Sequence, residues 1–172
     1  DAMQPKSYTV FKWAVYALAT LLFFSLQGLV LDHVRVWGLT PFLYPILPAV
    51  EAMYEGPRRG PVFALVMGLF CDILIWGPFE GFYALSFTII ALISAVIGEN
   101  MLTPGTFCAL LVSVGALLGT GGLRVLVHLL SGGQYVRLTA RLALGEAIIS
   151  LPALLLILPV YRIIHRRCAV DY

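Results

Sequence analysis

Charged residues are scarce in this chain of 172 residues: Asp, Glu, Lys and Arg make up 12% of it, against 60% for the apolar set AVILMFWYC. Soluble chains average roughly 25% charged and roughly 45–50% apolar residues, so an ordinary soluble domain is excluded. Six membrane-spanning helices of about 20 residues would leave about 52 residues for tails and loops, too few for a further soluble domain. The composition predicts an integral membrane protein with a single transmembrane domain over residues 1–172.

Cysteines and catalytic motifs are also scarce. Cys71 and Cys108 lie in apolar runs and Cys168 lies in the basic tail, without CxxC or zinc-ligand spacing, so we interpret them as small apolar fillers. The motifs G-x-S-x-G, H-E-x-x-H, the P-loop and G-x-G-x-x-G are absent, and the three histidines lie in three different regions. We therefore expect no enzyme, no cofactor and no metal. Without a run of Lys or Arg, we also expect no nucleic-acid partner.

Long apolar runs are what the sequence has instead. They predict six spans, at about 10–31, 39–54, 60–76, 81–98, 106–130 and 142–164. The second span is short and carries Pro41, Pro45 and Pro48, so its first half cannot be a regular helix. Such a break persists in a membrane only where protein or water covers the freed backbone groups. The short connection at residues 77–80 predicts that the third and fourth spans form an antiparallel helical hairpin.

Basic residues predict the orientation, because short cytoplasmic segments carry an excess of Lys and Arg. With six spans and the amino terminus inside, the cytoplasmic side holds Lys6, Lys12, Arg58, Arg59, Arg162, Arg166 and Arg167. The outer side holds Arg35, Arg137 and Arg141. We therefore expect both termini in the cytoplasm. Glu51 and Glu55, close to the Arg58-Arg59 pair, are expected to be interfacial charges at the cytoplasmic end of the second span.

Small residues recur at helical spacing in the third, fourth and fifth predicted spans. The third span has Gly60, Ala64 and Gly68 at intervals of four, on a face that continues to Asp72. The fourth span has Gly81, Ala84, Thr88, Ala91, Ala95 and Gly98, and the fifth has Gly115, Gly119, Gly121 and Gly122. Helices in lipid associate through such faces because small side chains let the backbones approach closely. We expect packing within the chain, with a homodimer interface as the alternative.

Four of the ionisable residues inside the predicted spans are expected in the outer leaflet, where each costs about 3 kcal/mol on insertion scales. They are Asp72, Arg124, His128 and Glu146. At about 1.5 Å per residue, three of them lie about 6 to 9 Å from the outer ends of their spans, with His128 nearer the surface. We therefore expect an outer-leaflet polar cluster. Its role stays open between an ion pair of Arg124 with Asp72 or Glu146, an outward-opening ligand site, and a docking surface for a partner helix.

Residues 60–74, GPVFALVMGLFCDIL, followed by GPFEGFYAL at 77–85, resemble the central hairpin of the rod shape-determining membrane protein MreD family. That family typically has a glycine-rich third span reading G-L-x-x-D, a short loop, and then a glycine and an Ala-Leu pair. The total length, the proline-broken second span and the basic carboxyl tail are similar too. The resemblance implies an all-α, six-span helical bundle like the substrate-binding subunits of energy-coupling-factor transporters, with both termini cytoplasmic, in the bacterial inner membrane.

The resemblance also implies a function, that of a non-enzymatic multipass scaffold in the bacterial cell-elongation machinery, which determines rod shape through peptidoglycan synthesis. It implies binding to MreC, and association with MreB and with RodA and its partner transpeptidase. Gly68 and Asp72 are expected to be the most function-sensitive pair. The basic cytoplasmic edge is expected to meet membrane lipids or an acidic partner.

The alternative comes from another class, the substrate-binding subunits of vitamin transporters, with Asp72, Arg124, His128 and Glu146 as an outward-facing ligand site. Those subunits usually carry Ala-x-x-x-Ala on the first span, for docking the coupling subunit. Here the alanines of the first span are Ala14, Ala17 and Ala19, and none are four apart. This difference favours the scaffold.

Overall fold

The computed structural model describes residues 6–29, 33, 38–100, 105–133 and 135–168, and these residues form six α-helices and no β-strand. The helices are α1 (Lys6–Leu29), α2 (Ile46–Glu55), α3 (Gly60–Leu74), α4 (Phe82–Asn100), α5 (Thr106–Leu130) and α6 (Val136–Cys168). The all-helical prediction is confirmed. Residues 30 and 31, which end the first predicted span, and Arg35 lie outside the described residues.

Three helical stretches in this part of the chain are long and apolar enough to cross a membrane. They are Phe82–Asn100, Thr106–Leu130 and Val136–Leu155. Two further apolar stretches, Trp13–Leu29 and Gly60–Leu74, are shorter. The composition and these helices together indicate a helical membrane protein.

The short helix α2 is the centre of the fold. It has ten residues, about 15 Å, which is too short to cross about 30 Å of hydrocarbon by itself. Pro45 directly precedes it, and Pro48 stands in its first turn, where a missing N–H group leaves no helical hydrogen bond unmade. The helix ends at Gly56, whose φ of 80° favours glycine. The predicted break in the first half of the second span is therefore confirmed.

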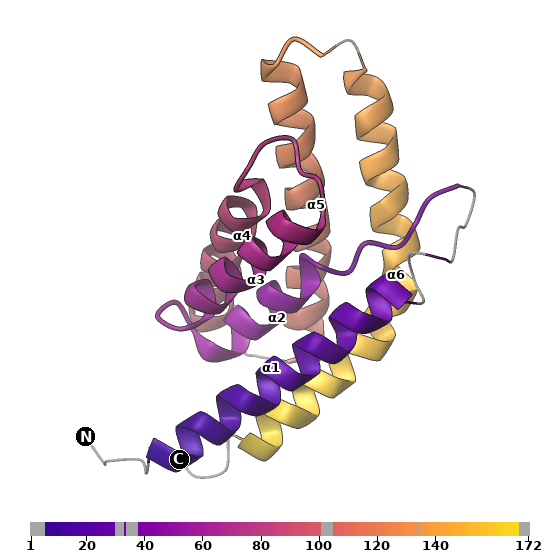
Figure 1. Ribbon diagram of the computed structural model, residues 1–172. Coiled ribbons are helices and arrows are strands. Elements are labelled where there is room, and N and C mark those ends of the chain that lie inside the picture. The colour runs from indigo at the N-terminus through magenta and orange to yellow at the C-terminus, as the bar shows by residue number, and fades with distance from the viewer. Residues whose placement is uncertain (1–5, 30–32, 34–37, 101–104, 134, 169–172) are drawn as a thin grey trace.

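Four of the other helices surround α2. All residues from Ile46 to Met53 are buried, and α2 contacts α3, α4, α5 and α6 (Figure 1). The α3–α4 pair forms the predicted hairpin, joined by residues 75–81. α1 lies along one half of α6, where the hydroxyls of Thr20 and Tyr161 are 3.0 Å apart. Phe23 of α1 stacks on the Tyr161 ring, with centroids 6.0 Å apart.

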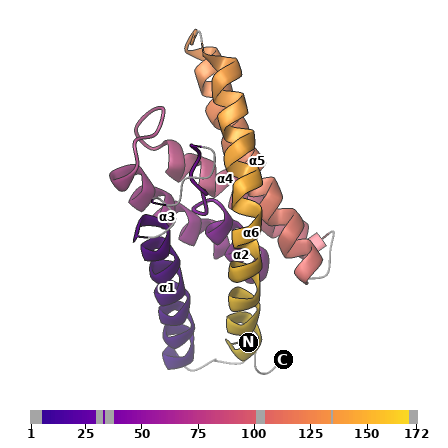
Figure 2. The same ribbon diagram turned by 90° about the vertical axis from the view of Figure 1, so that its right-hand side faces the viewer.

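The remaining half of α6 pairs with α5. The two helices extend beyond the others and turn near Gly132, whose φ is 71° (Figure 2). α6 changes direction along its length and carries Pro152 and Pro159, which remove helical hydrogen bonds and bend helices (Figure 1). The α3–α4 turn lies toward the same end of the molecule as the α5–α6 turn. The first residue of α1 and the last of α6 lie together at the opposite end.

Candidate functional site

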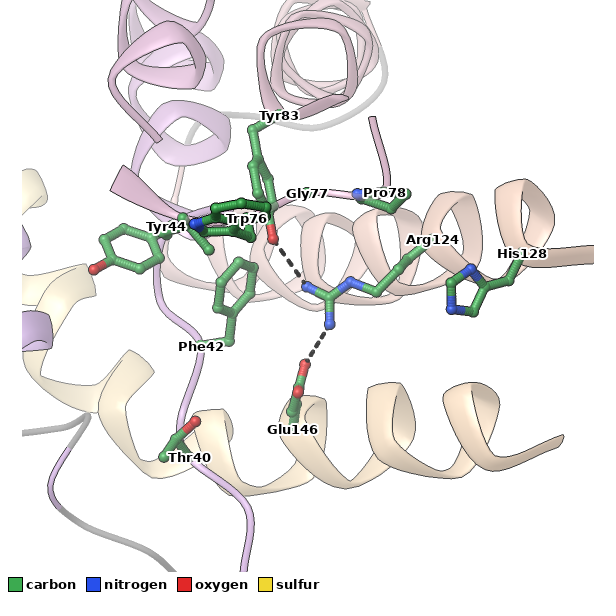
Figure 3. A pocket seen from close by; sticks show the side chains of 11 residues that line it. Thr40, Phe42, Tyr44, Trp76, Gly77, Pro78, Tyr83, Arg124, His128 and Glu146 are labelled. Atoms are coloured by element: carbon green, nitrogen blue, oxygen red, sulfur yellow. Dashed lines mark hydrogen bonds and ion pairs between the residues drawn. The ribbon is translucent and has the colours of Figure 1, made fainter. Parts of the chain in front are cut away.

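Arg124 on α5 is the centre of a polar group between α4, α5 and α6. Its guanidinium donates to Glu146 Oε2 at 3.1 Å, which forms an ion pair between α5 and α6. Its other terminal nitrogen lies 3.5 Å from the hydroxyl of Tyr83 on α4. The guanidinium carbon also lies 5.3 Å from the ring centroid of Phe42, within the range of a cation–π interaction. One side chain therefore joins three helices and the segment that leads into α2 (Figure 3).

The ion pair is largely covered by the protein. The side chain of Arg124 is 22% exposed and that of Glu146 is 24% exposed. Pairing lowers the cost of holding either charge in an apolar region, and removing one partner would leave the other uncompensated. The sequence leaves Asp72 and Glu146 open as partners for Arg124, and in the structure the partner is Glu146.

Asp72 does not join this polar group. Its two carboxylate oxygens accept hydrogen bonds from the backbone N–H groups of Tyr83 and Ala84, each at 2.9 Å. The first N–H groups of a helix have no acceptor within that helix, and a carboxylate there also interacts favourably with the helix dipole. The expectation that Asp72 belongs to the cluster with Arg124 is therefore wrong. Asp72 instead caps α4 from the end of the preceding helix.

A cavity of about 460 Å³ lies beside the ion pair. It is lined by Thr40, Phe42, Tyr44, Ile75, Trp76, Gly77, Pro78, Tyr83, Arg124, His128 and Glu146. Figure 3 shows His128 one turn further along α5 than Arg124. Three of the four residues of the predicted cluster thus share one cavity, near the α3–α4 turn. Its volume is within the range of small-molecule sites, and its aromatic rings and charged pair could hold a ligand that has an apolar part and a polar group.

The small-residue stripes of α3 and α4 pack inside the fold and meet at Gly68 and Ala84. A Cβ atom on Gly68 would collide with the Cα atom of Ala84, and it would lie 2.7 Å from both the Ala84 nitrogen and the Tyr83 oxygen. Ala64, one turn earlier on α3, is fully buried. Only glycine at position 68 therefore permits this approach of the two backbones.

Away from the hairpin turn, the stripes face α2 rather than each other. A Cβ atom on Gly60 would collide with Ala52, and one on Gly98 would lie 2.7 Å from the carbonyl oxygen of Met53. Gly81 packs against none of the residues that the structure describes, because none of their atoms lies within 4 Å of a Cβ built there. Its φ of 85° explains the glycine instead. The expectation that Gly81 is a packing residue is wrong.

Two polar side chains that the sequence pattern did not single out hold the non-helical segment before α2. Gln27 of α1 donates from Nε2 to the carbonyl oxygen of Pro41 at 2.6 Å and accepts from the Leu43 N–H at 3.1 Å. Ser150 of α6 accepts from the Phe42 N–H at 2.8 Å. The sequence does carry a signal for both residues. Each is an isolated polar residue inside an apolar span, and the proline-rich segment of the same chain leaves backbone groups without helical hydrogen bonds. Through these contacts, neighbouring helices satisfy the backbone groups that a break in a membrane helix leaves without hydrogen bonds.

Glu51 is also wrongly predicted. It was expected at the cytoplasmic interface, but its side chain is 0% exposed, because α2 lies at the centre of the fold. Its carboxylate interacts electrostatically with the hydroxyl of Tyr161 on α6. Glu55, the last residue of α2, is partly exposed.

The described residues contain no group of three or more His, Cys, Asp or Glu side chains placed to hold one metal ion. Cys71 and Cys108 are both free and buried. No protein-family model matches this chain, and neither does any curated protein or any solved structure. A function is therefore argued from the residues and their geometry.

Proposed function

We propose that this protein is a non-enzymatic multipass scaffold of the bacterial cell-elongation machinery, related to the MreD family. In this proposal the chain crosses the inner membrane six times, with both termini in the cytoplasm. It binds the membrane-anchored protein MreC and links it to MreB and to RodA with its partner transpeptidase. The proposal is supported first by the MreD-like residues, since two of them, Gly68 and Asp72, lock the α3–α4 hairpin.

The observation that carries the scaffold proposal is an unpartnered stripe on α5. Steps of four and three separate its exposed residues, which therefore share one face of the helix: Leu111, Gly115, Leu118, Gly122 and Leu126. No atom of the described residues lies within 4 Å of a Cβ atom on Gly115 or Gly122. This α5 stripe differs from those of α3 and α4, in which Gly60, Gly68 and Gly98 pack within the fold.

Glycines on an exposed helix face suit a partner helix. A glycine inside a helix costs about 1 kcal/mol relative to alanine, and in the described part of the chain no contact offsets that cost at Gly115 or Gly122. Helices in lipid pack most closely across small residues flanked by larger ones. The α5 stripe has this pattern, so the proposal assigns it to the membrane span of MreC.

The test is co-purification of MreC with tagged protein in mild detergent. Gly115→Leu with Gly122→Leu should reduce the recovered MreC by about tenfold, because two leucines would hold the partner backbone away. Gly28→Leu on α1 is the matched control, since Gly28 is also exposed with nothing within 4 Å of a Cβ. Full MreC recovery with the α5 double variant would contradict the assignment of the stripe. Absence of MreC with the unaltered protein would contradict the scaffold itself.

The cavity beside Arg124 favours a second candidate, a substrate-binding subunit of a vitamin transporter. Its volume of about 460 Å³ and its mixed aromatic and charged lining suit a vitamin-sized molecule. Mass spectrometry of small molecules released from the purified protein distinguishes the two candidates. A stoichiometric ligand that is lost in Arg124→Ala, recovered together with ATPase subunits, would replace the scaffold proposal. Recovery of MreC without such a ligand would support the scaffold proposal and would mean that the ion pair of Arg124 has a structural role.

A further inference from the structure

An apolar groove runs between α1 and α3 on the outside of the fold. We call it the α1–α3 groove; its walls include Ala17, Leu21 and Phe24 on α1, and Phe63, Val66 and Phe70 on α3. It consists of two stretches, of about 480 and 390 Å³, that share Ala17, Phe63 and Val66 and are therefore continuous. Leu21, Val66 and Phe70 are 62%, 48% and 57% exposed. Nothing in the described part of the chain covers these side chains.

One end of the groove is cationic. Arg58 and Arg59, which directly precede α3, line the same stretch as Trp13. Both arginines are exposed. The rings of Trp13 and Phe63 lie 6.3 Å apart and bridge the two helices at this end. Tryptophan and arginine side chains at the end of an apolar stretch are typical of the membrane interface, where lipid phosphates lie.

The length of the groove fits a lipid chain. It follows α3 from Val62 to Leu74, and twelve steps of about 1.5 Å give about 18 Å. One leaflet of the hydrocarbon core is about 15 Å deep, half of about 30 Å. An acyl chain lying in the groove would therefore have its headgroup beside Arg58 and Arg59.

The walls of the groove suit an acyl chain better than a helix. Close helix packing in lipid uses small residues, but the small residues of α3, Gly60, Ala64 and Gly68, face the interior. The groove side of α3 carries large side chains instead. A flexible chain can follow such an uneven apolar wall, and an α-helix, about 10 Å across, cannot.

We propose that the α1–α3 groove binds one anionic phospholipid, with an acyl chain between α1 and α3 and the headgroup phosphate at Arg58 and Arg59. The arginines supply the charge complementarity, and the groove supplies the apolar contact. The site is separate from the cavity beside Arg124 and from the α5 stripe. It depends on the membrane location of the chain and not on which partners it binds.

The test is native mass spectrometry of the full-length, delipidated protein titrated with phosphatidylglycerol or phosphatidylcholine of identical acyl chains. The unaltered protein should bind phosphatidylglycerol about 25-fold more tightly, because each of the two arginines near an anionic headgroup contributes about a factor of five. Arg58→Gln with Arg59→Gln should abolish this preference. Arg137→Gln with Arg141→Gln removes the same charge from exposed positions at the start of α6 and should preserve it.

A second pair of variants tests the groove itself. Ala17→Trp should weaken binding of both lipids, because the indole would fill the space shared by the two stretches. Ala14→Trp is the matched control on α1, since Ala14 is exposed and lines neither stretch. Equal affinity of the unaltered protein for both lipids, or unchanged binding in Ala17→Trp, would overturn the proposal. So would a stoichiometric single-span protein that co-purifies with the unaltered chain and is lost in Ala17→Trp, which would assign the groove to a partner helix.

Discussion

At the scale of the residue, Asp72 ties the end of α3 to the start of α4. The carboxylate accepts from two consecutive backbone N–H groups, those of Tyr83 and Ala84. The same Tyr83 presents its hydroxyl to Arg124. Asp72 therefore positions one wall of the cavity without lining it, and a variant there would act on the cavity through α4.

We expect Asp72→Ala to lower the free energy of unfolding by about 2 kcal/mol, because two backbone donors lose their acceptor. Asp72→Asn keeps one acceptor oxygen and should cost about half as much. The measurement is denaturation in detergent followed by far-ultraviolet circular dichroism. Glu80→Ala, at an exposed position in the same turn, is the control and should change stability by less than about 0.5 kcal/mol. A loss in Glu80→Ala equal to that in Asp72→Ala would contradict the capping role.

Gly68 and Gly115 should respond to alanine with opposite signs. At position 68 the added methyl group meets the backbone of Ala84, which cannot move aside as a flexible side chain would, so we expect a loss of about 2 kcal/mol. At position 115 the methyl group meets nothing within 4 Å, so higher helix propensity should add up to about 1 kcal/mol. Thermal unfolding in detergent measures both. Destabilisation of the two variants to a similar extent would show that glycine at position 68 is not selected by packing.

At the scale of the element, the entry into α2 is the feature that most needs support from other helices. Prolines prevent a regular helix before Ile46, and Gln27 of α1 and Ser150 of α6 supply the missing hydrogen-bond partners. The break itself could be predicted, because the ring of proline and its lack of an N–H group act locally. The two side chains that satisfy it could not, since they lie 16 and 108 residues away along the chain.

Hydrogen exchange should separate these two supports. Gln27→Leu should raise the exchange rate of the Leu43 amide, and Ser150→Ala that of the Phe42 amide, because each variant removes one acceptor. Each should also cost about 1–3 kcal/mol of stability by leaving a buried backbone group unpaired. Ser113→Ala is the control, since that hydroxyl donates within its own helix to the Ala109 carbonyl. Unchanged exchange at both amides would mean that other groups hold this segment.

At the scale of the whole molecule, the second predicted span differs from an ordinary transmembrane helix. Residues 40–43 precede the turn into α2 and, fully extended, would reach about 14 Å, while α2 adds about 15 Å. Together they suffice for about 30 Å of hydrocarbon. In the proposed topology the chain therefore crosses six times, although α2 is too short to cross by itself.

Thiol labelling tests this topology in a Cys168→Ser background, where the buried Cys71 and Cys108 remain. A membrane-impermeant maleimide should label Glu80→Cys and Ser131→Cys in intact spheroplasts, because both lie in turns at the proposed outer end. Arg59→Cys should be labelled only after permeabilisation. Labelling of Arg59→Cys in intact spheroplasts, with Glu80→Cys and Ser131→Cys protected, would show the opposite orientation. It would contradict the proposed cytoplasmic location of the termini.

The features that depend on local pattern could be predicted from the residues alone. Apolar runs located the helices, the prolines located the break before α2, and the spacing of Gly68 and Ala84 identified faces that pack. Charged residues inside apolar runs also pointed to Arg124, His128 and Glu146, because such residues are costly without a partner.

Which of these features meet could be seen only in the folded chain. It paired Arg124 with Glu146 and assigned Asp72 to the start of α4. It also buried Glu51, because α2 is enclosed by four other helices. The physical reason is that depth in a membrane and position along one helix can be read from residue spacing, whereas the rotation of each helix toward its neighbours depends on packing across the whole bundle.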